Sequence, residues 1–342
     1  MALFEIRDCD ARIYRERLAD FLPEKLYDIH THVYMPDAHI TADCRTASWP
    51  ARVADRNPPE HLTETYRLLF PGRDCRALIF GSPAPGMDVD AANRYIDAAA
   101  EATGFAKLYL THPSMSPDAL RDAVKHRGYR GIKVYLCFAD PAIPDASLRI
   151  FDFLTREHLA VMDELGAVVM LHIARPQRLR DPQNLADLLE IERDFPHVRL
   201  IVAHIGRAYC ESDVGDAMEV LAGTRQMRFD FSANTNGQVM ERLLRTVGPS
   251  RVLFGSDLPI TRMRMRRIDE HGRYVNVIQR GMYGDVSDDP HMREVDAADD
   301  PEMTFFMYEE LLAFRGAAER AGLSREDVRR VFFRNAEEIL DL

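Results

Sequence analysis

The sequence predicts an α/β fold, a (β/α)8 TIM barrel with long loops after strands 1 and 8. Eight short apolar segments recur along the chain, helical patterns separate them, and most of the connections are short. Most of these segments are continuously apolar, which is typical of parallel strands covered on both faces. The expected strands are residues 26–32, 76–81, 106–111, 129–136, 167–174, 199–206, 227–233 and 251–257.

An open, doubly wound sheet is the alternative architecture, but no G-x-G-x-x-G motif follows the first expected strand. The 342 residues would allow two domains of about 150 residues each, and a barrel of about 250 residues with insertions fits equally well. We expect a single domain over residues 1–342, with insertions at about 33–74 and 258–302. Both insertions would leave the carboxyl ends of strands and cap the mouth, where the active sites of barrels lie.

Helix signals lie between the expected strands. Ser116 and Asp181 are each followed by proline, the pattern of an N-cap with proline in the first turn. The last helix is expected to start at Ser324, with Asp327 completing a variant of the capping box. Its apolar stripe includes Asn335, for which we expect a structural hydrogen bond to the backbone.

Composition and charge exclude several classes of protein. The net charge of −11 argues against nonspecific binding to nucleic acid or anionic membranes, because both need a basic surface. Charged residues crowd the first ten positions, so no signal peptide is expected to begin there, and the apolar stretch 166–174 is too short to span a bilayer. The five scattered cysteines form no C-x-x-C pair, which favours a reduced, cytoplasmic protein.

The strongest local signal is Asp28-Ile-His30-Thr-His32 at the end of the first expected strand. Residues two apart in a strand point to the same face, so both imidazoles would project into the barrel. A first-row divalent metal is the usual partner of such a pair, although a chance pair of partly exposed histidines has the same spacing.

Three further polar residues end other expected strands: His172, His204 and Asp257. A buried imidazole or carboxylate needs a partner, so each is an unusual choice for a core position. All of these groups would lie at the same end of a barrel and would converge on one point. Their convergence predicts a metal site.

This ordered set resembles the amidohydrolase superfamily. The flanking segments Tyr27–His32, 203–206, 254–259 and 333–336 look like its amidohydrolase-related branch, which contains lactonases, a hydratase and nonoxidative decarboxylases. The resemblance implies that His30, His32, His172 and Asp257 are metal ligands, that Asp257 accepts a proton from metal-activated water, and that His204 is a catalytic acid–base or a further ligand. One divalent ion is expected, Zn²⁺ or alternatively Mn²⁺.

Lys133 on the fourth expected strand has several interpretations. In binuclear members of the superfamily a lysine on this strand is carbamylated and bridges two metals. A substrate-binding cation, or a partner for a nearby carboxylate, is the alternative for Lys133.

Several arginines and asparagines follow the candidate histidines. Arg175 and Arg207 each lie three residues after one of them, and guanidinium suits carboxylate recognition, so an anionic substrate is expected. Each arginine alone would pass for a solvated loop residue. Asn234 is a further candidate for substrate binding, with a turn-forming role as the alternative.

The function expected from these residues is a metal-dependent hydrolase acting on a small, carboxylated lactone, ester or amide. A decarboxylase of the same family would use the same residues, and a noncatalytic barrel binding a metal or sugar acid is the alternative from another class. The expected partner is a small anionic molecule, without nucleic acid or membrane, and a homo-oligomer is compatible with the fold.

Overall fold

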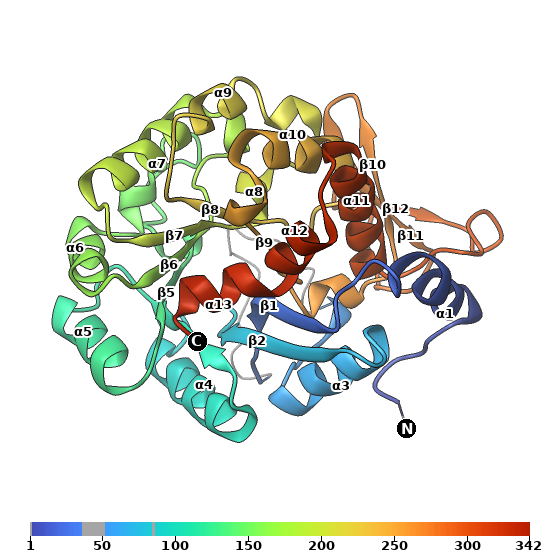
Figure 1. Cartoon of the computed structure of the whole chain (residues 1–342), viewed down its shortest axis with the longest axis horizontal. Coiled ribbons are helices and arrows are strands. Elements are labelled where there is room, and N and C mark those ends of the chain that lie inside the picture. The colour runs from blue at the N-terminus through green and yellow to red at the C-terminus, as the bar shows by residue number, and fades with distance from the viewer. Residues whose placement is uncertain (1, 36–51, 84–85) are drawn as a thin grey trace.

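The computed structural model describes residues 2–35, 52–83 and 86–342. It contains a closed barrel of parallel strands inside a ring of helices, so the predicted (β/α)8 TIM barrel is confirmed (Figure 1). The barrel strands are β1 (Lys25–His32), β2 (Asp74–Phe80), β3 (Ala106–Lys107), β4 (Tyr109–Thr111), β5 (Gly131–Val134), β6 (Val168–Leu171), β7 (Arg199–Val202), β8 (Arg228–Asp230) and β9 (Val252–Leu253).

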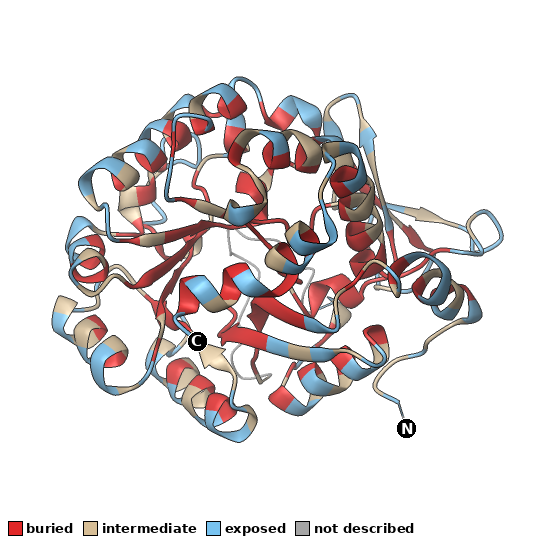
Figure 2. Cartoon of the chain, in the orientation of Figure 1, coloured by how far each residue is buried: buried red, intermediate tan, exposed pale blue. Residues whose placement is uncertain are grey.

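Helices follow the strands and pack around the barrel. The helical segments are α1 (Asp8–Ile13), η1 (Tyr14–Leu18), α3 (Pro59–Leu69), α4 (Val89–Thr103), α5 (Pro117–His126), α6 (Arg156–Leu165), α7 (Pro182–Asp194), α8 (His204–Arg207), α9 (Ala217–Leu221), α10 (Gly237–Val247), α11 (Phe306–Ala321), α12 (Arg325–Arg329), η9 (Arg330–Arg334) and α13 (Asn335–Leu340). Their inner faces are buried and their outer faces exposed, whereas the barrel strands are buried over most of their length (Figure 2). Ser116 and Asp181 cap α5 and α7 as predicted.

The first and last barrel strands close the barrel. The Ile29 amide donates to the Phe254 carbonyl at 2.9 Å, and Thr31 pairs in parallel with Leu258. Expected strand 106–111 is interrupted at Leu108, whose amide still bonds to the Ile79 carbonyl. The barrel is therefore continuous although its hydrogen-bonded strands are shorter than the apolar segments.

A compact apolar cluster fills the barrel interior. Ile29, Leu78, Met170 and Ile201 belong to it, and Ile339 of α13 packs against it. The C-terminal helices thus cover the amino end of the barrel, and they lie across the front of Figure 1. This leaves the opposite, carboxyl end for the polar residues.

The C-terminal segment forms as the sequence predicts at both ends. Ser324 and Asp327 make the reciprocal capping-box hydrogen bonds at the start of α12. Asn335 is fully buried, and its amide nitrogen donates to the carbonyls of Pro249 and Val252, each at 2.8 Å. Its expected structural role is confirmed.

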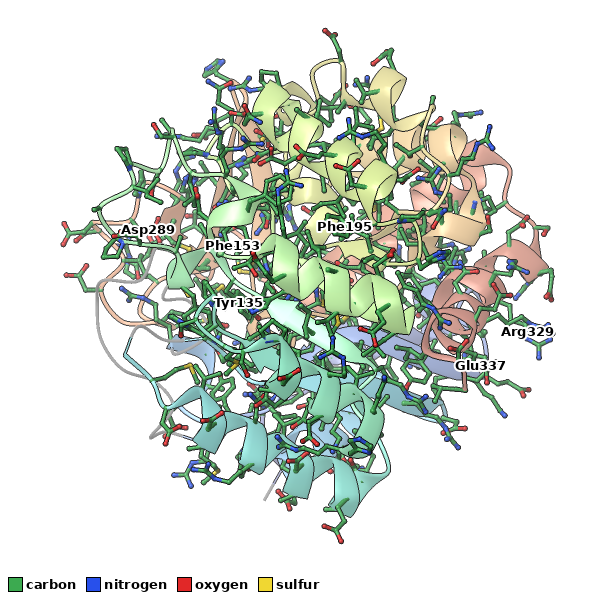
Figure 3. All side chains as sticks on the ribbon, turned by 90° about the vertical axis from the view of Figure 1, so that its left-hand side faces the viewer. Tyr135, Phe153, Phe195, Asp289, Arg329 and Glu337 are labelled. Atoms are coloured by element: carbon green, nitrogen blue, oxygen red, sulfur yellow. The ribbon has the colours of Figure 1, made fainter. Side chains whose placement is uncertain are left out.

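The two long connections differ in content. Residues 36–51 of the first lie outside the described residues, and its remainder holds α3. The second contains an unpredicted three-stranded sheet of β10 (Arg266–Glu270), β11 (Arg273–Gln279) and β12 (Met292–Val295). In side view Asp289 of this insertion lies at one edge of the molecule and Arg329 and Glu337 of the C-terminal helices lie at the other (Figure 3).

No helix in the described part of the chain is both long enough and apolar enough to cross a membrane.

Candidate metal centre

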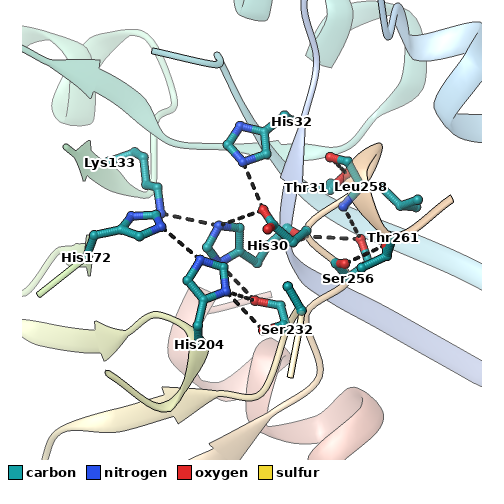
Figure 4. Close-up of polar contacts among 12 residues, drawn as sticks. His30, Thr31, His32, Lys133, His172, His204, Ser232, Ser256, Leu258 and Thr261 are labelled. Atoms are coloured by element: carbon teal, nitrogen blue, oxygen red, sulfur yellow. Dashed lines mark hydrogen bonds and ion pairs between the residues drawn. The ribbon is translucent and has the colours of Figure 1, made fainter. Parts of the chain in front are cut away.

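The five polar groups predicted to converge lie together at the carboxyl end of the barrel (Figure 4). His30 and His32 belong to β1, whereas His172, His204 and Asp257 follow β6, β7 and β9. Asp257 Oδ1 lies 3.2 Å from His32 Nε2 and 3.6 Å from His30 Nε2, and His172 Nε2 lies 2.8 Å from His204 Nε2. The strands therefore bring together all of the predicted ligands.

The orientation of His30 is set by a residue that the sequence analysis missed. His30 Nδ1 lies 3.0 Å from Asp230 Oδ2, at the end of β8. A carboxylate only accepts hydrogen bonds, so Nδ1 carries the proton and Nε2 keeps its lone pair toward the centre. Burial, reinforced by Lys133, lowers the pKa of His30 to about 3, so the imidazole is neutral.

Asp230 is buried and fully engaged. Besides His30 it accepts the His204 amide at 2.9 Å and the Ser232 hydroxyl at 2.5 Å. Burial alone would raise its pKa, but His30 and these further donors hold the pKa below the usual range. The signal that would have identified Asp230 is the one used for Asp257, a carboxylate at the end of an apolar segment.

Two more histidines direct Nε2 to the centre. His32 Nδ1 lies 3.3 Å from the Gly81 carbonyl and His204 Nδ1 lies 3.0 Å from the Ser232 carbonyl. A carbonyl only accepts, so in both rings Nδ1 donates and Nε2 is directed to the centre. His32 Nε2 then faces the carboxylate oxygen of Asp257 at a distance that a proton or a metal ion can bridge. This pairing fits a bound metal ion.

The candidate ligand atoms form two overlapping groups. His30, His172 and His204 make one, and His30, His32 and Asp257 make the other, with the ligand atoms of each within 4.8 Å of one another. Imidazole and carboxylate donors suit zinc, manganese and related ions. His204 lies as close to a shared centre as the predicted ligands do, so its role as ligand or as acid–base stays a prediction.

Asp257 remains ionised in this setting. Burial alone would raise its pKa, but the neighbouring imidazoles of His204 and His32 lower the pKa to about 2. For His172 and His204, burial is the main cause that lowers the pKa of each imidazole. The centre thus combines neutral imidazoles with a carboxylate anion.

Lys133 lies between two of the histidines. Its Nζ is 3.4 Å from His30 Nε2 and 3.2 Å from His172 Nδ1, and the side chain is fully buried. Burial lowers the pKa of Lys133 to about 7, against the opposite effect of Asp230 and Asp257. Lys133 is therefore part of the centre, while its carbamylation and its contact with substrate stay predictions.

Asp28 ties β1 to the segment that carries Asp257. Its buried carboxylate accepts the amides of His30 and Ser256, at 3.1 and 2.8 Å, and the hydroxyls of Tyr66 and Ser256. Burial raises the pKa of Asp28 to about 7. Asp28 lies two residues before the H-x-H motif, and no role was predicted for it.

The backbone at the barrel mouth is locally strained. The four residues of α8, His204–Arg207, all have positive φ, and so does Asp257 at 55°. At Gly206 a Cβ atom would lie 2.7 Å from Leu179 Cδ1, so glycine is required there. Non-glycine residues with positive φ are uncommon and cluster at functional sites.

The predicted substrate-binding residues differ in their contacts. Arg175 Nε donates to the Leu148 carbonyl at 3.0 Å, and Asn234 donates to the Ala208 carbonyl at 2.8 Å, so both are engaged within the fold. Arg207 is partly buried and has no hydrogen-bond or ion-pair partner for its guanidinium in the described residues. Its positive charge contributes to the lowered pKa of His172. The binding of substrate by these three residues stays a prediction.

A family model described as Amidohydrolase matches residues 27–342. No curated protein matches the sequence significantly. Among solved structures, an amidohydrolase from Burkholderia multivorans with bound zinc is similar, with 16% identity, a TM-score of 0.59, and coverage of 93% of this chain and 99% of that one.

Two other similar structures carry named activities. A probable 2-pyrone-4,6-dicarboxylic acid hydrolase from Acinetobacter baumannii has 15% identity and a TM-score of 0.56, covering 93% of this chain and 99% of that one. A 5-carboxyvanillate decarboxylase from Novosphingobium aromaticivorans, complexed with manganese and a nitrobenzoic acid, has 12% identity and a TM-score of 0.56, covering 93% and 96%. These likenesses agree with the barrel fold.

Proposed function

This chain belongs to the amidohydrolase family, and from that premise we propose that it is a metal-dependent hydrolase of a small, carboxylated lactone, ester or amide. The predicted enzyme class is confirmed by the family match. The observation that carries the proposal is the convergence of imidazole and carboxylate ligand atoms at the barrel mouth, where those of His30, His32 and Asp257 lie within 4.8 Å of one another.

We propose one divalent ion per chain, zinc or alternatively manganese, held by His30, His32, His172 and Asp257. The similar structures from Burkholderia and Novosphingobium contain zinc and manganese respectively, which supports both candidates. When bound, such an ion polarises a carbonyl and lowers the pKa of coordinated water.

The side chains supply the remaining steps. Asp257 is ionised and accepts the proton of the attacking water. His204, whose Nδ1 is held by the Ser232 carbonyl, presents Nε2 toward the substrate; Nε2 takes up the proton that Asp257 accepts from the water and passes it to the leaving oxygen or nitrogen. Arg207 binds the substrate carboxylate through its guanidinium.

A decarboxylase is the second candidate, because one similar structure is a decarboxylase holding an aromatic acid. In that reaction the same centre would bind the carboxylate that is lost, and His204 or Asp257 would protonate the carbon left behind. The two reactions differ in their products, which makes them separable by assay.

The test begins with the metal content of purified protein, for which we expect close to one equivalent of divalent ion. A panel of lactones, carboxylated esters, amides and aromatic acids is then assayed for released acid and released carbon dioxide in parallel. Acid without carbon dioxide supports the hydrolase, carbon dioxide supports the decarboxylase, and an absence of metal overturns both.

His204→Asn separates a ligand from an acid–base. If His204 is the acid–base, the variant keeps its metal and loses at least about 10²-fold in turnover. Loss of the metal would instead assign His204 to the ligands, and nearly unchanged turnover would assign it a structural role.

We further propose that the chain acts as one domain, with the second long connection beside the mouth. A small anion is the proposed partner, without nucleic acid or membrane, in the cytoplasm. A homo-oligomer remains compatible with this proposal.

A further inference from the structure

A basic hollow lies at the end of the barrel opposite the metal centre. It has a volume of about 660 Å³, within the range of small-molecule sites. The segments that form it lead into the amino ends of β6, β7, β8 and β9, and Glu338 of α13 lies at its border. Figure 1 views the barrel from this end, with α13 in front.

Four arginines line this hollow: Arg199, Arg225, Arg228 and Arg251. Such a concentration is unexpected in a chain whose net charge is −11. The only carboxylate among the lining residues is that of Glu338, which pairs with Arg330 at 2.9 Å outside the hollow. The lining therefore carries a surplus of positive charge.

The side chains of two of the four arginines form hydrogen bonds or an ion pair within the fold. Arg251 donates to the carbonyls of Met227 and Thr224, both at 2.8 Å, and Arg199 pairs with Asp341 at 2.5 Å. The Arg251 contacts fix the guanidinium without neutralising its charge. Arg251 therefore contributes a fixed positive charge to the lining of the hollow.

The other two arginines have unused guanidinium groups. Arg225 is exposed and Arg228 is partly buried, and neither side chain has a hydrogen-bond or ion-pair partner in the described part of the chain. Burial lowers the pKa of Arg228; the carboxylate of Glu338 acts against this, and the like charges of Arg199 and Arg330 lower the pKa further. Holding these cations together costs free energy that a bound anion would offset.

We propose that this hollow binds a small polyanion, a molecule with at least two phosphate or carboxylate groups, which Arg225 and Arg228 contact while Arg251 and Arg199 form the basic wall. Guanidinium groups match both kinds of oxyanion with paired hydrogen bonds. The hollow and the metal centre lie at opposite ends of the barrel, so this ligand does not compete with the substrate.

The test is calorimetric titration of the metal-loaded protein with pyrophosphate, with citrate and with acetate at one fixed ionic strength. We expect saturable binding of pyrophosphate or citrate with Kd below about 1 mM, weakening as salt increases, and no saturable binding of acetate. A preference between the first two distinguishes a phosphorylated ligand from a polycarboxylate.

Three variants locate the binding. Arg228→Gln and the exposed Arg225→Gln should each weaken binding at least about 10-fold, and the second remains informative if the first fails to fold. Arg280→Gln is the surface control, because Arg280 pairs with Glu294 and Asp296 and does not line the hollow. Arg207→Met controls for capture of the anion at the barrel mouth.

The proposal is overturned if neither polyanion binds, or if both Arg225→Gln and Arg228→Gln bind as wild type does. It is also overturned if only Arg207→Met weakens binding, since the anion would then lie at the metal centre. Because the readout is binding and not turnover, failure here leaves the proposed hydrolase untouched.

Discussion

At the scale of single residues, the contact between Asp230 and His30 decides how the metal centre is organised. The carboxylate fixes the His30 proton on Nδ1 and so directs Nε2 toward the centre. A carboxylate behind a histidine ligand typically changes metal affinity by 10- to 100-fold.

We therefore expect Asp230→Asn to keep the barrel but to weaken metal binding by about 10- to 100-fold. Competition with a chromophoric chelator measures the affinity, and circular dichroism checks the fold. Asp299→Asn, at an exposed position, serves as the matched control. An unchanged affinity in Asp230→Asn would remove this residue from the account of the centre.

The two candidate substrate arginines should behave differently. Arg207 has an unused guanidinium, whereas Arg175 is bonded to the Leu148 carbonyl. Loss of a bidentate contact to a carboxylate costs on the order of 2–4 kcal/mol, so Arg207→Met should lower kcat/KM by about 30- to 1000-fold. Most of this loss should appear in KM, because the contact binds ground and transition states alike.

Arg175→Met is the comparison, and we expect it to lower thermal stability more than it changes KM. The measurement uses a carboxylated substrate and its neutral methyl ester in all three proteins. Equal use of acid and ester by the wild type, with no change of KM in Arg207→Met, would exclude the guanidinium from substrate binding.

The sequence was sufficient to predict the five central residues but not their hydrogen-bonding roles. His30, His32, His172, His204 and Asp257 stand out because each interrupts or ends an apolar strand. Asp230 has the same signal and was overlooked, and the orientation of His32 depends on the carbonyl of Gly81, which directly follows β2. Such contacts follow from the register between strands, which a single sequence does not encode directly.

At the scale of elements, the C-terminal segment is attached to the barrel by Asn335. Its amide nitrogen serves the carbonyls of Pro249 and Val252 at the amino end of β9. Asn335→Ala would remove both hydrogen bonds and leave the Pro249 carbonyl with only the Val252 amide, at a cost of about 1–3 kcal/mol. We expect a lower Tm with unchanged metal content.

Glu337→Ala is the control for that measurement, since it lies on the same helix at a less buried position. A Tm loss no larger than that of the control would show that α13 is held by its apolar contacts alone.

Element boundaries were less predictable than element types. Segment 199–206 is apolar apart from Arg199 and His204, yet β7 ends at Val202 because the backbone turns to positive φ at His204. Hydrophobic patterns report burial, whereas strand assignment depends on the hydrogen-bonded backbone. The sheet of β10, β11 and β12 was missed for a related reason. Residues 285–300, which include β12, are rich in acidic side chains, and such a sequence is typical of a solvated loop.

At the scale of the whole molecule, the negative net charge conceals two regions of positive charge, one at each end of the barrel. The chain carries −11, but Arg207 lies unneutralised at the mouth and four arginines line the hollow at the other end. The barrel itself was predictable because the sequence contains eight apolar segments separated by helical patterns, and a (β/α)8 barrel buries all eight around one core. The positive charge at the mouth was expected from Arg175 and Arg207, whereas that of the hollow was not, because its four arginines come from separate segments of the chain.

The pH dependence of stability has a contribution from Glu310, which is buried on α11. Its Oε2 accepts the Ala233 amide at 2.6 Å, and its Oε1 is buried with no hydrogen-bond partner in the described structure. Burial raises the pKa of Glu310 well above its ordinary value. The folded state therefore binds this proton more tightly than the unfolded chain, whose glutamate pKa is about 4.3.

The sign of the effect follows from linkage. The stabilising contribution of protonated Glu310 is complete below the unfolded pKa and is lost as pH rises from there through the folded pKa.

Glu310→Gln keeps an acceptor for the Ala233 amide but has no proton to lose. We expect the difference in Tm between variant and wild type to grow in favour of the variant from pH 5 to pH 9. Thermal unfolding across that range measures it, with Glu319→Gln, in an exposed ion pair with Arg315, as control. Parallel pH profiles for Glu310→Gln and wild type would mean that Glu310 keeps the same protonation state folded and unfolded, contrary to its burial.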